Sequence, residues 1–123
     1  MDHFVVTDNV PRPAGPYSHG VVAQGLLFTA GMGPHRPDGT LAGDTVADQT
    51  TQVLRNLEAI LAARQRTLAD VVKVTVHLAD VERDFAEFNA AYHEVMPAPY
   101  PVRTTVGSTL LGILVEIDVV ALA

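Results

Sequence analysis

Hydrophobic and polar residues repeat with two different periods along this chain, and these periods distinguish helices from strands. Apolar residues recur every three or four positions in residues 46–61 and again in residues 85–95, which predicts two amphipathic helices. Alternating or short continuous apolar runs predict a sheet of five or six strands. The candidate strands are residues 4–6, 21–23, 26–30, 71–78, 102–107 and 113–118. The predicted order is therefore a strand, a hairpin, a helix, a strand, a helix and two strands.

The first predicted helix has a capping signal, one apolar face and a defined end. Thr45 and Asp48 fit the capping-box pattern, in which two residues three apart satisfy free backbone N–H groups. The apolar face consists of Val46, Thr50, Val53, Leu54, Leu57, Ile60 and Leu61. Gln65 follows the helix, and a left-handed conformation at this residue costs about 1 kcal/mol relative to glycine.

The second predicted helix starts near Asp80 and stops before Pro97, because proline lacks the N–H that a helix interior needs. Its expected buried stripe consists of Phe85, Phe88, Tyr92 and Val95. Asn89 lies one turn from Phe85 and has two interpretations, a hydrogen bond to the backbone or contact with a ligand. Each helix has a single apolar stripe, so we expect both helices to cover the same face of the sheet.

The last two predicted strands each carry charge within an apolar or β-branched run. We expect a hairpin-like connection between them, with Arg103 and Thr105 on one face of the first strand. Glu116 and Asp118 share one face of the second strand. The apolar row opposite them is Ile113, Val115, Ile117 and Val119. A buried charge needs a partner, so Arg103 and Glu116 either pair with each other or solvent, or bind a ligand.

The sheet face away from the helices is expected to be half polar and half apolar. Its expected polar members are Lys73, Thr75, His77, Arg103, Thr105, Glu116 and Asp118, with Leu114, Val120 and Leu122 between them. The opposite row of the strand 71–78 is Val72, Val74, Val76 and Leu78. A sheet face of this kind is not expected to stay bare on a monomer, which predicts closed, symmetric self-association.

Composition and charge restrict the class of protein further. The 123 residues suit one compact domain, residues 1–123, and 48% of them are hydrophobic, so disorder is not expected. The net charge is −6 and no basic cluster is present, which argues against a nucleic-acid partner. We find no apolar run long enough for a membrane helix and no signal-peptide pattern, so the expected location is cytoplasmic. Cysteine is absent, and the five histidines, most of them expected in solvent, form no close ligand pair, so no metal is expected.

Two separated stretches resemble the signatures of the Rid family (also called RidA, YjgF-type or L-PSP), which are small enamine/imine deaminases. The first stretch is Pro13-Ala14-Gly15-Pro16-Tyr17-Ser18, and the second is Pro101-Val102-Arg103-Thr104-Thr105-Val106 followed by Leu114-Val115-Glu116-Ile117-Asp118. This resemblance implies an α+β, chorismate-mutase-like fold with a mixed sheet and two helices on one face. It also implies a homotrimer with sites between subunits.

The resemblance assigns roles to individual residues. Arg103 matches the arginine that binds the substrate carboxylate, and Glu116 matches the glutamate that holds water. Tyr17, Gly31 and Asn89 match positions around the site, and Thr105 stands where many members have cysteine. The implied reaction is hydrolysis of 2-imino acids, or of enamines such as 2-aminoacrylate, to 2-keto acids and ammonia. It requires a small carboxylate metabolite and neither a metal nor an organic cofactor.

Some positions depart from the family pattern and leave other functions open. Ala30 and Met32 replace a serine and a glutamine that flank Gly31 in the family, and the loop 108–112 is short and lacks the frequent Leu-Pro. A non-catalytic protein that binds or senses small carboxylates is therefore one alternative. Endoribonuclease activity is a second and less favoured alternative, because the chain is acidic.

Overall fold

The computed structural model describes residues 2–123 and contains a six-stranded sheet with two α-helices. The strands are β1 (Phe4–Val5), β2 (Gly20–Ala23), β3 (Leu26–Thr29), β4 (Val71–Leu78), β5 (Val102–Gly107) and β6 (Val115–Leu122). The helices are α1 (Val46–Ala62) and α2 (Val81–Val95), with a 3-10 turn at Leu68–Asp70. The α+β class and the order of elements predicted from the sequence are confirmed.

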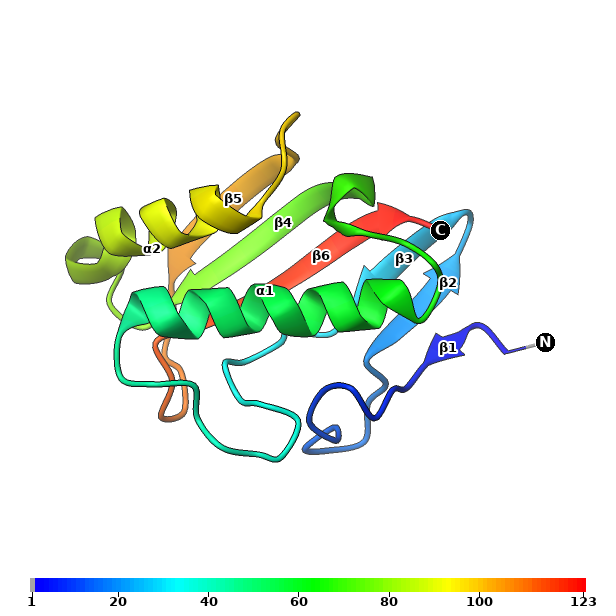
Figure 1. Cartoon of the computed structure of the whole chain (residues 1–123), viewed down its shortest axis with the longest axis horizontal. Coiled ribbons are helices and arrows are strands. Elements are labelled where there is room, and N and C mark those ends of the chain that lie inside the picture. The colour runs from blue at the N-terminus through cyan, green and yellow to red at the C-terminus, as the bar shows by residue number, and fades with distance from the viewer. Residues whose placement is uncertain (1) are drawn as a thin grey trace.

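The strand order in the sheet is β1-β2-β3-β6-β4-β5 (Figure 1). All neighbours are antiparallel except β4 and β5, which run parallel and are connected through α2. The prediction that the last two strands form a hairpin is therefore wrong, because β4 lies between β5 and β6. A parallel neighbour needs a long crossover, and α2 provides it, which leaves β5 at the edge of the sheet.

Both helices cover the same face of the sheet, as predicted, with α2 over the β5 edge and α1 over the middle (Figure 1). All seven residues of the predicted apolar face of α1 are buried. Thr45 caps this helix, because its hydroxyl accepts a hydrogen bond from the N–H of Asp48 at 3.1 Å. The predicted stripe of α2 is correct for Phe88 and Tyr92 but wrong for Phe85, which is 41% exposed near the beginning of the helix.

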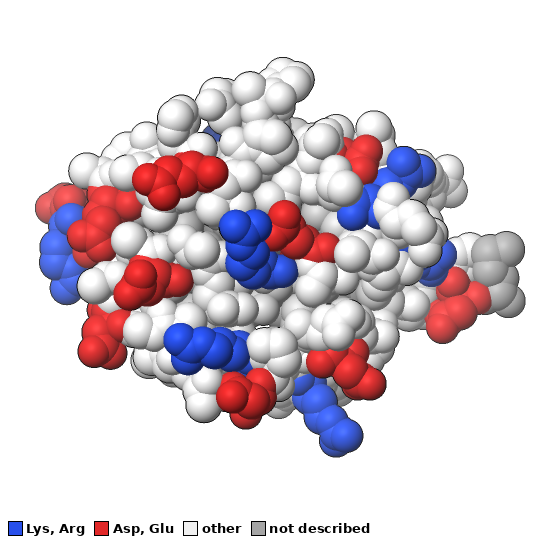
Figure 2. Space-filling model, in the orientation of Figure 1, with Lys and Arg blue, Asp and Glu red and all other residues white. Residues whose placement is uncertain are grey.

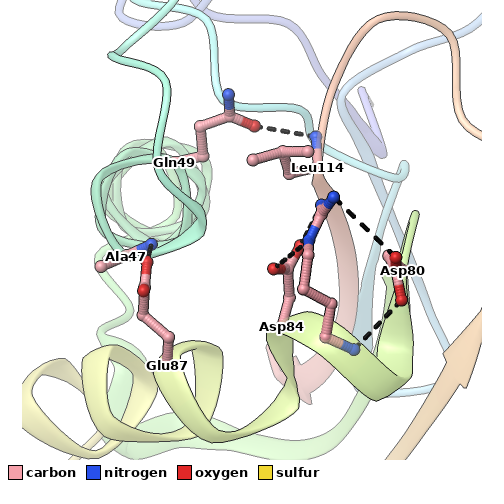
Figure 3. A network of polar contacts seen from close by, with 7 residues as sticks. Ala47, Gln49, Asp80, Asp84, Glu87 and Leu114 are labelled. Carbon is pink, nitrogen blue, oxygen red and sulfur yellow. Dashed lines mark hydrogen bonds and ion pairs between the residues drawn. The ribbon is translucent and has the colours of Figure 1, made fainter.

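Polar contacts fix the two helices to each other and to the end of the sheet (Figure 3). Glu87 on α2 accepts a hydrogen bond from the N–H of Ala47, in the first turn of α1. Gln49 on α1 accepts one from the N–H of Leu114, just before β6. A carboxylate beside the first turn of a helix also interacts favourably with the helix dipole. These contacts hold α2, and therefore its side chains over β5, in a defined position.

Two turns place non-glycine residues in the left-handed region. Gln24 has φ 54° and Gly25 has φ 75°, which confirms the tight hairpin between β2 and β3. Gln65 has φ 55°, just beyond the end of α1. The N–H of the next residue, Arg66, returns to the carbonyl of Leu61 at 3.0 Å. Gln65 therefore adopts the left-handed conformation that was considered for it from the sequence.

The register shows which residues share each face of the sheet. Arg103 is paired with Val74, and Thr105 with Val76, and both valines are fully buried beneath the helices. Arg103 and Thr105 therefore face the helices, and their expected position on the open face is wrong. Val72 is 40% exposed rather than buried, since the register between β4 and β6 shifts after Val71.

No helix within residues 2–123 combines the length and the apolar character that crossing a membrane requires.

Candidate functional site

Arg103 lies between β5 and the inner side of α2. Its guanidinium carbon is 4.7 Å from the ring centre of Tyr92 and 5.4 Å from that of Phe88. Contact with aromatic faces favours a cation and restricts the conformations of the side chain. Nη2 donates a hydrogen bond of 2.9 Å to Oδ1 of Asn89. Among the described residues, Asn89 therefore bonds to the side chain of Arg103, and the interpretation in which it bonds to the backbone is wrong.

The positive charge of Arg103 has no acidic partner among residues 2–123. It borders a cavity of about 400 Å³ between the end of α2 and the beginning of β5. The lining residues are Asn89, Tyr92, His93, Tyr100, Pro101 and Arg103. Burial raises the pKa of the Tyr92 hydroxyl, an effect that the nearby Arg103 charge partly opposes. A cationic fork beside an open, partly aromatic cavity is suited to bind a carboxylate.

Thr105 is two residues further along β5, on the same side as Arg103. Its hydroxyl oxygen is buried and has no hydrogen-bond partner in the described chain. A buried hydroxyl without a partner costs free energy, and such groups are uncommon outside sites that contact water or a ligand. Thr105 therefore lies beside Arg103, and the role that the family resemblance implies for it stays a prediction.

Glu116 belongs to a second group of residues, on the open face of the sheet. It is paired with His77 across β4, and the side chain of His77 points away from the helices. The segment after β3 continues along β6, where Met32 and Ile117 form an isolated bridge. Gly31 consequently lies against Glu116: a Cβ atom at residue 31 would be 2.7 Å from Oε2 of the carboxylate. A side chain at residue 31 would therefore require the Glu116 carboxylate to move.

Tyr17 lies on the same side of the molecule as Gly31. Both residues line a small cavity of about 120 Å³. The hydroxyl of Tyr17 accepts a hydrogen bond of 3.0 Å from the N–H of Ala14. The buried His19 supports this loop, since its Nδ1 accepts from the N–H of Thr7 and its Nε2 donates to the carbonyl of Pro11. The expectation that most of the histidines are in solvent is therefore wrong for His19, which is 1% exposed.

Asp118 lies next to Glu116 along the same face of β6. Burial raises the pKa of its carboxyl, while the nearby His77 and Lys73 act in the opposite direction. The two basic residues lie diagonally across from it on β4, on either side of Thr75. The open face thus contains four titratable side chains close together, namely Lys73, His77, Glu116 and Asp118. Among these four, Glu116 is the residue that lies against Gly31.

The six predicted site residues therefore form two groups rather than one. Arg103, Asn89 and Thr105 lie on the helix side of β5, whereas Tyr17, Gly31 and Glu116 lie near β3 and β6. Within one chain β4 separates Arg103 from Glu116, and their side chains leave opposite faces. The prediction that Arg103 and Glu116 lie on adjacent strands and on the same face of the sheet is therefore wrong. Tyr100 is not among the residues predicted for the site, although it lines the same cavity as Arg103.

Comparisons with known proteins identify the family. The sequence profile described as Endoribonuclease L-PSP matches residues 7–123. A RutC family protein of Pyrococcus horikoshii is 41% identical over 124 residues, which cover 98% of this chain and 98% of that protein. The chain belongs to the L-PSP family, whose members include the Rid proteins.

Two further relatives bear on the site. Reactive Intermediate Deaminase A of the Arabidopsis thaliana chloroplast is 38% identical over 120 residues, covering 95% of this chain and 64% of that protein. The crystal structure of E. coli TdcF with bound serine has a TM-score of 0.88 and 32% identity, covering 99% of each chain. The family thus includes a protein named as a deaminase and another with a bound amino acid.

Proposed function

We propose that this protein hydrolyses reactive 2-imino acids, and the enamines that tautomerise to them, to 2-keto acids and ammonia. The observation that carries the proposal is the free cationic fork of Arg103, anchored by Asn89 beside a cavity of about 400 Å³. A guanidinium binds a carboxylate through two parallel hydrogen bonds. The serine bound to TdcF, an amino acid with one carboxylate, supports this class of ligand.

The proposed site is completed by a second copy of the chain. Arg103 and Glu116 point away from opposite faces of one sheet, so one protomer must supply Arg103 and its neighbour Glu116. The open face supports such contact, because Val102 is 68% exposed and Leu122 49% exposed on it. Apolar surface of this kind is usually buried by a partner. The family resemblance makes the assembly a homotrimer with three equivalent sites.

The chemistry follows from the two groups. The carboxylate of the substrate binds Arg103, which leaves one face of the planar imine carbon directed towards Glu116 of the neighbouring copy. Glu116 accepts a proton from water as the water oxygen bonds to that carbon. It then gives this proton to nitrogen, which forms a carbinolamine. As the C–N bond breaks and the C=O bond forms, Glu116 moves the hydroxyl proton to nitrogen, and ammonia leaves. Acid–base assistance of this kind contributes about 10²–10⁴-fold.

The reaction as proposed needs no metal and no organic cofactor. The imine carbon is already electrophilic, and orientation by Arg103 together with proton transfer by Glu116 is sufficient for the bond changes. We also propose a cytoplasmic location, in line with the expectation from the sequence.

Mixed assemblies test the proposal directly. Arg103→Ala and Glu116→Ala are each expected to lose keto-acid release from imines generated in situ by an amino-acid oxidase. Co-folding the two variants in equal amounts is expected to restore about one quarter of the wild-type activity. In randomly mixed trimers, about one quarter of the sites combine an intact Arg103 from one variant with an intact Glu116 from the other. Circular dichroism and light scattering check that each variant folds and assembles. No recovery in confirmed mixed assemblies would contradict the shared site.

A non-catalytic carboxylate-binding protein is the competing function, because Ala30 and Met32 replace the polar residues that the family resemblance leads us to expect beside Gly31. Calorimetric binding of 2-keto acids together with an absence of ammonia release would favour it.

Endoribonuclease activity has less support. Figure 2 shows acidic and basic side chains interspersed over the helix-covered face, and the net charge is −6, whereas an RNA-binding surface is usually a basic cluster.

A further inference from the structure

The cavity beside Arg103 has a composition that the carboxylate alone does not explain. It is lined by two tyrosines, a histidine and a proline in addition to Arg103 and Asn89. Its volume of about 400 Å³ is within the usual range for small-molecule pockets, about 300–1,000 Å³. A ligand such as 2-aminoacrylate, with a carboxylate and two further carbons, would leave most of this space empty.

The aromatic residues of the cavity are arranged around the guanidinium. Tyr92 lies directly under the guanidinium of Arg103, and the rings of His93 and Tyr100 have their centres 6.1 Å apart and are tilted by 43°. Tyr100 is 55% exposed, so its ring is available to a ligand in the isolated chain. Aromatic pairs attract one another at centre distances of about 4.5–7 Å in offset or tilted orientations. An aromatic ring of a ligand that enters the cavity could therefore pack against Tyr92, His93 and Tyr100 in this way.

We propose that this cavity receives the substrate side chain and that the preferred substrates are 2-imino acids with an aromatic or large apolar side chain. This inference rests on the proposed function, since it needs the carboxylate on Arg103. The imine carbon has three substituents in one plane. With its carboxylate on Arg103 and its side chain among Tyr92, His93 and Tyr100, the face of that carbon remains open to the neighbouring copy.

The test compares substrates and variants. Imines of phenylalanine, leucine and alanine are generated in situ by an amino-acid oxidase, and kcat and KM are measured for each. For the wild-type protein, kcat/KM is expected to be about tenfold or more higher for the phenylalanine-derived imine than for the alanine-derived one. Tyr100→Ala is expected to reduce this ratio to below about threefold, through a higher KM for the aromatic imine, whereas Tyr100→Phe keeps it.

A matched control removes an exposed aromatic side chain elsewhere. Phe4 on β1 is 60% exposed and far along the sheet from β5, so Phe4→Ala is expected to leave the ratio unchanged. Calorimetry with phenylpyruvate and pyruvate gives the same comparison for binding alone. Equal or better hydrolysis of the alanine-derived imine by the wild-type protein would overturn this inference and leave the proposed function intact. Absence of hydrolysis and of keto-acid binding would overturn both.

Discussion

The two groups of candidate site residues differ in how the fold holds them. The Arg103 group is built from side chains, because the aromatic residues and Asn89 of α2 position the guanidinium on an edge strand. The Glu116 group depends on a close approach of backbone, because the chain after β3 runs along β6 and places Gly31 against the carboxylate. The first group therefore depends on contacts between side chains, whereas the second depends on the absence of a side chain at residue 31. Substitutions in the two groups should consequently fail in different ways.

The largest effect is expected from Gly31→Ala. The added Cβ would be 2.7 Å from Oε2 of Glu116, so the carboxylate has to move. A displacement of about 1 Å at a catalytic group costs on the order of 100-fold in rate. We expect kcat for imine hydrolysis to fall by about that factor, with little change in keto-acid affinity.

Gly33→Ala is the matched control, because a Cβ there approaches Ile113 only to 3.4 Å, an ordinary contact. It should retain nearly full kcat. A Gly31→Ala variant with normal kcat would remove Glu116 from the mechanism or show that the sheet adjusts.

A smaller effect of a different kind is expected from Asn89→Ala. This change removes the hydrogen bond that holds Nη2 of Arg103, so the guanidinium loses orientation but remains in the cavity. A hydrogen bond to a charged group contributes about 1.5–3 kcal/mol, which corresponds to a rise in KM of about tenfold or more. Asn89→Asp should raise KM further, because the new carboxylate competes with the substrate for Arg103. If both variants bind keto acids normally, Asn89 has no positioning role.

Asp118→Asn tests the electrostatics of the open face through pH. Burial raises the pKa of this carboxyl in the folded chain, so its ionised form destabilises the fold at neutral pH. This cost is absent below the unfolded pKa, where the carboxyl is protonated in both states. Asp118→Asn should therefore raise the melting temperature at pH 7 relative to the wild-type protein and leave it unchanged near pH 3. Thermal denaturation at both pH values checks this, and a uniform shift would contradict it.

The smallest effect concerns a position outside both groups. Gln65 has φ 55°, and glycine adopts this conformation without the steric penalty of a side chain. Gln65→Gly is expected to stabilise the fold by about 1 kcal/mol, measured by urea denaturation. Activity should not change, because neither group of site residues touches this turn.

The elements and the helix faces could be predicted from the sequence because they depend on local periodicity. The stripe from Val46 to Leu61 and the capping residue Thr45 each carry their own signal. The position of Arg103 could not be predicted in the same way. Alternation shows that Arg103 and Thr105 share a face, but not which face meets the helices. The usual rule that the apolar row is buried fails on β5, where the exposed row contains Val102 and Val106.

The site residues themselves were identified from the sequence signatures, whereas their grouping required the topology. The pairing of β5 with β4 rather than β6 depends on the crossover through α2, which no short stretch of sequence specifies. Tyr100 and His93 were missed for a related reason. They come from a helix end and a loop that meet only when β5 lies parallel to β4.

His19 fastens the first segment of the chain through one buried ring. One ring nitrogen accepts from the N–H of Thr7 and the other donates to the carbonyl of Pro11, and the side chain is 1% exposed. An apolar side chain at this place would leave both backbone groups without a partner in a buried space. The loop that holds Tyr17 would then lose its attachment while the helices and the central strands remained in place, so a single imidazole decides whether this edge of the molecule stays ordered.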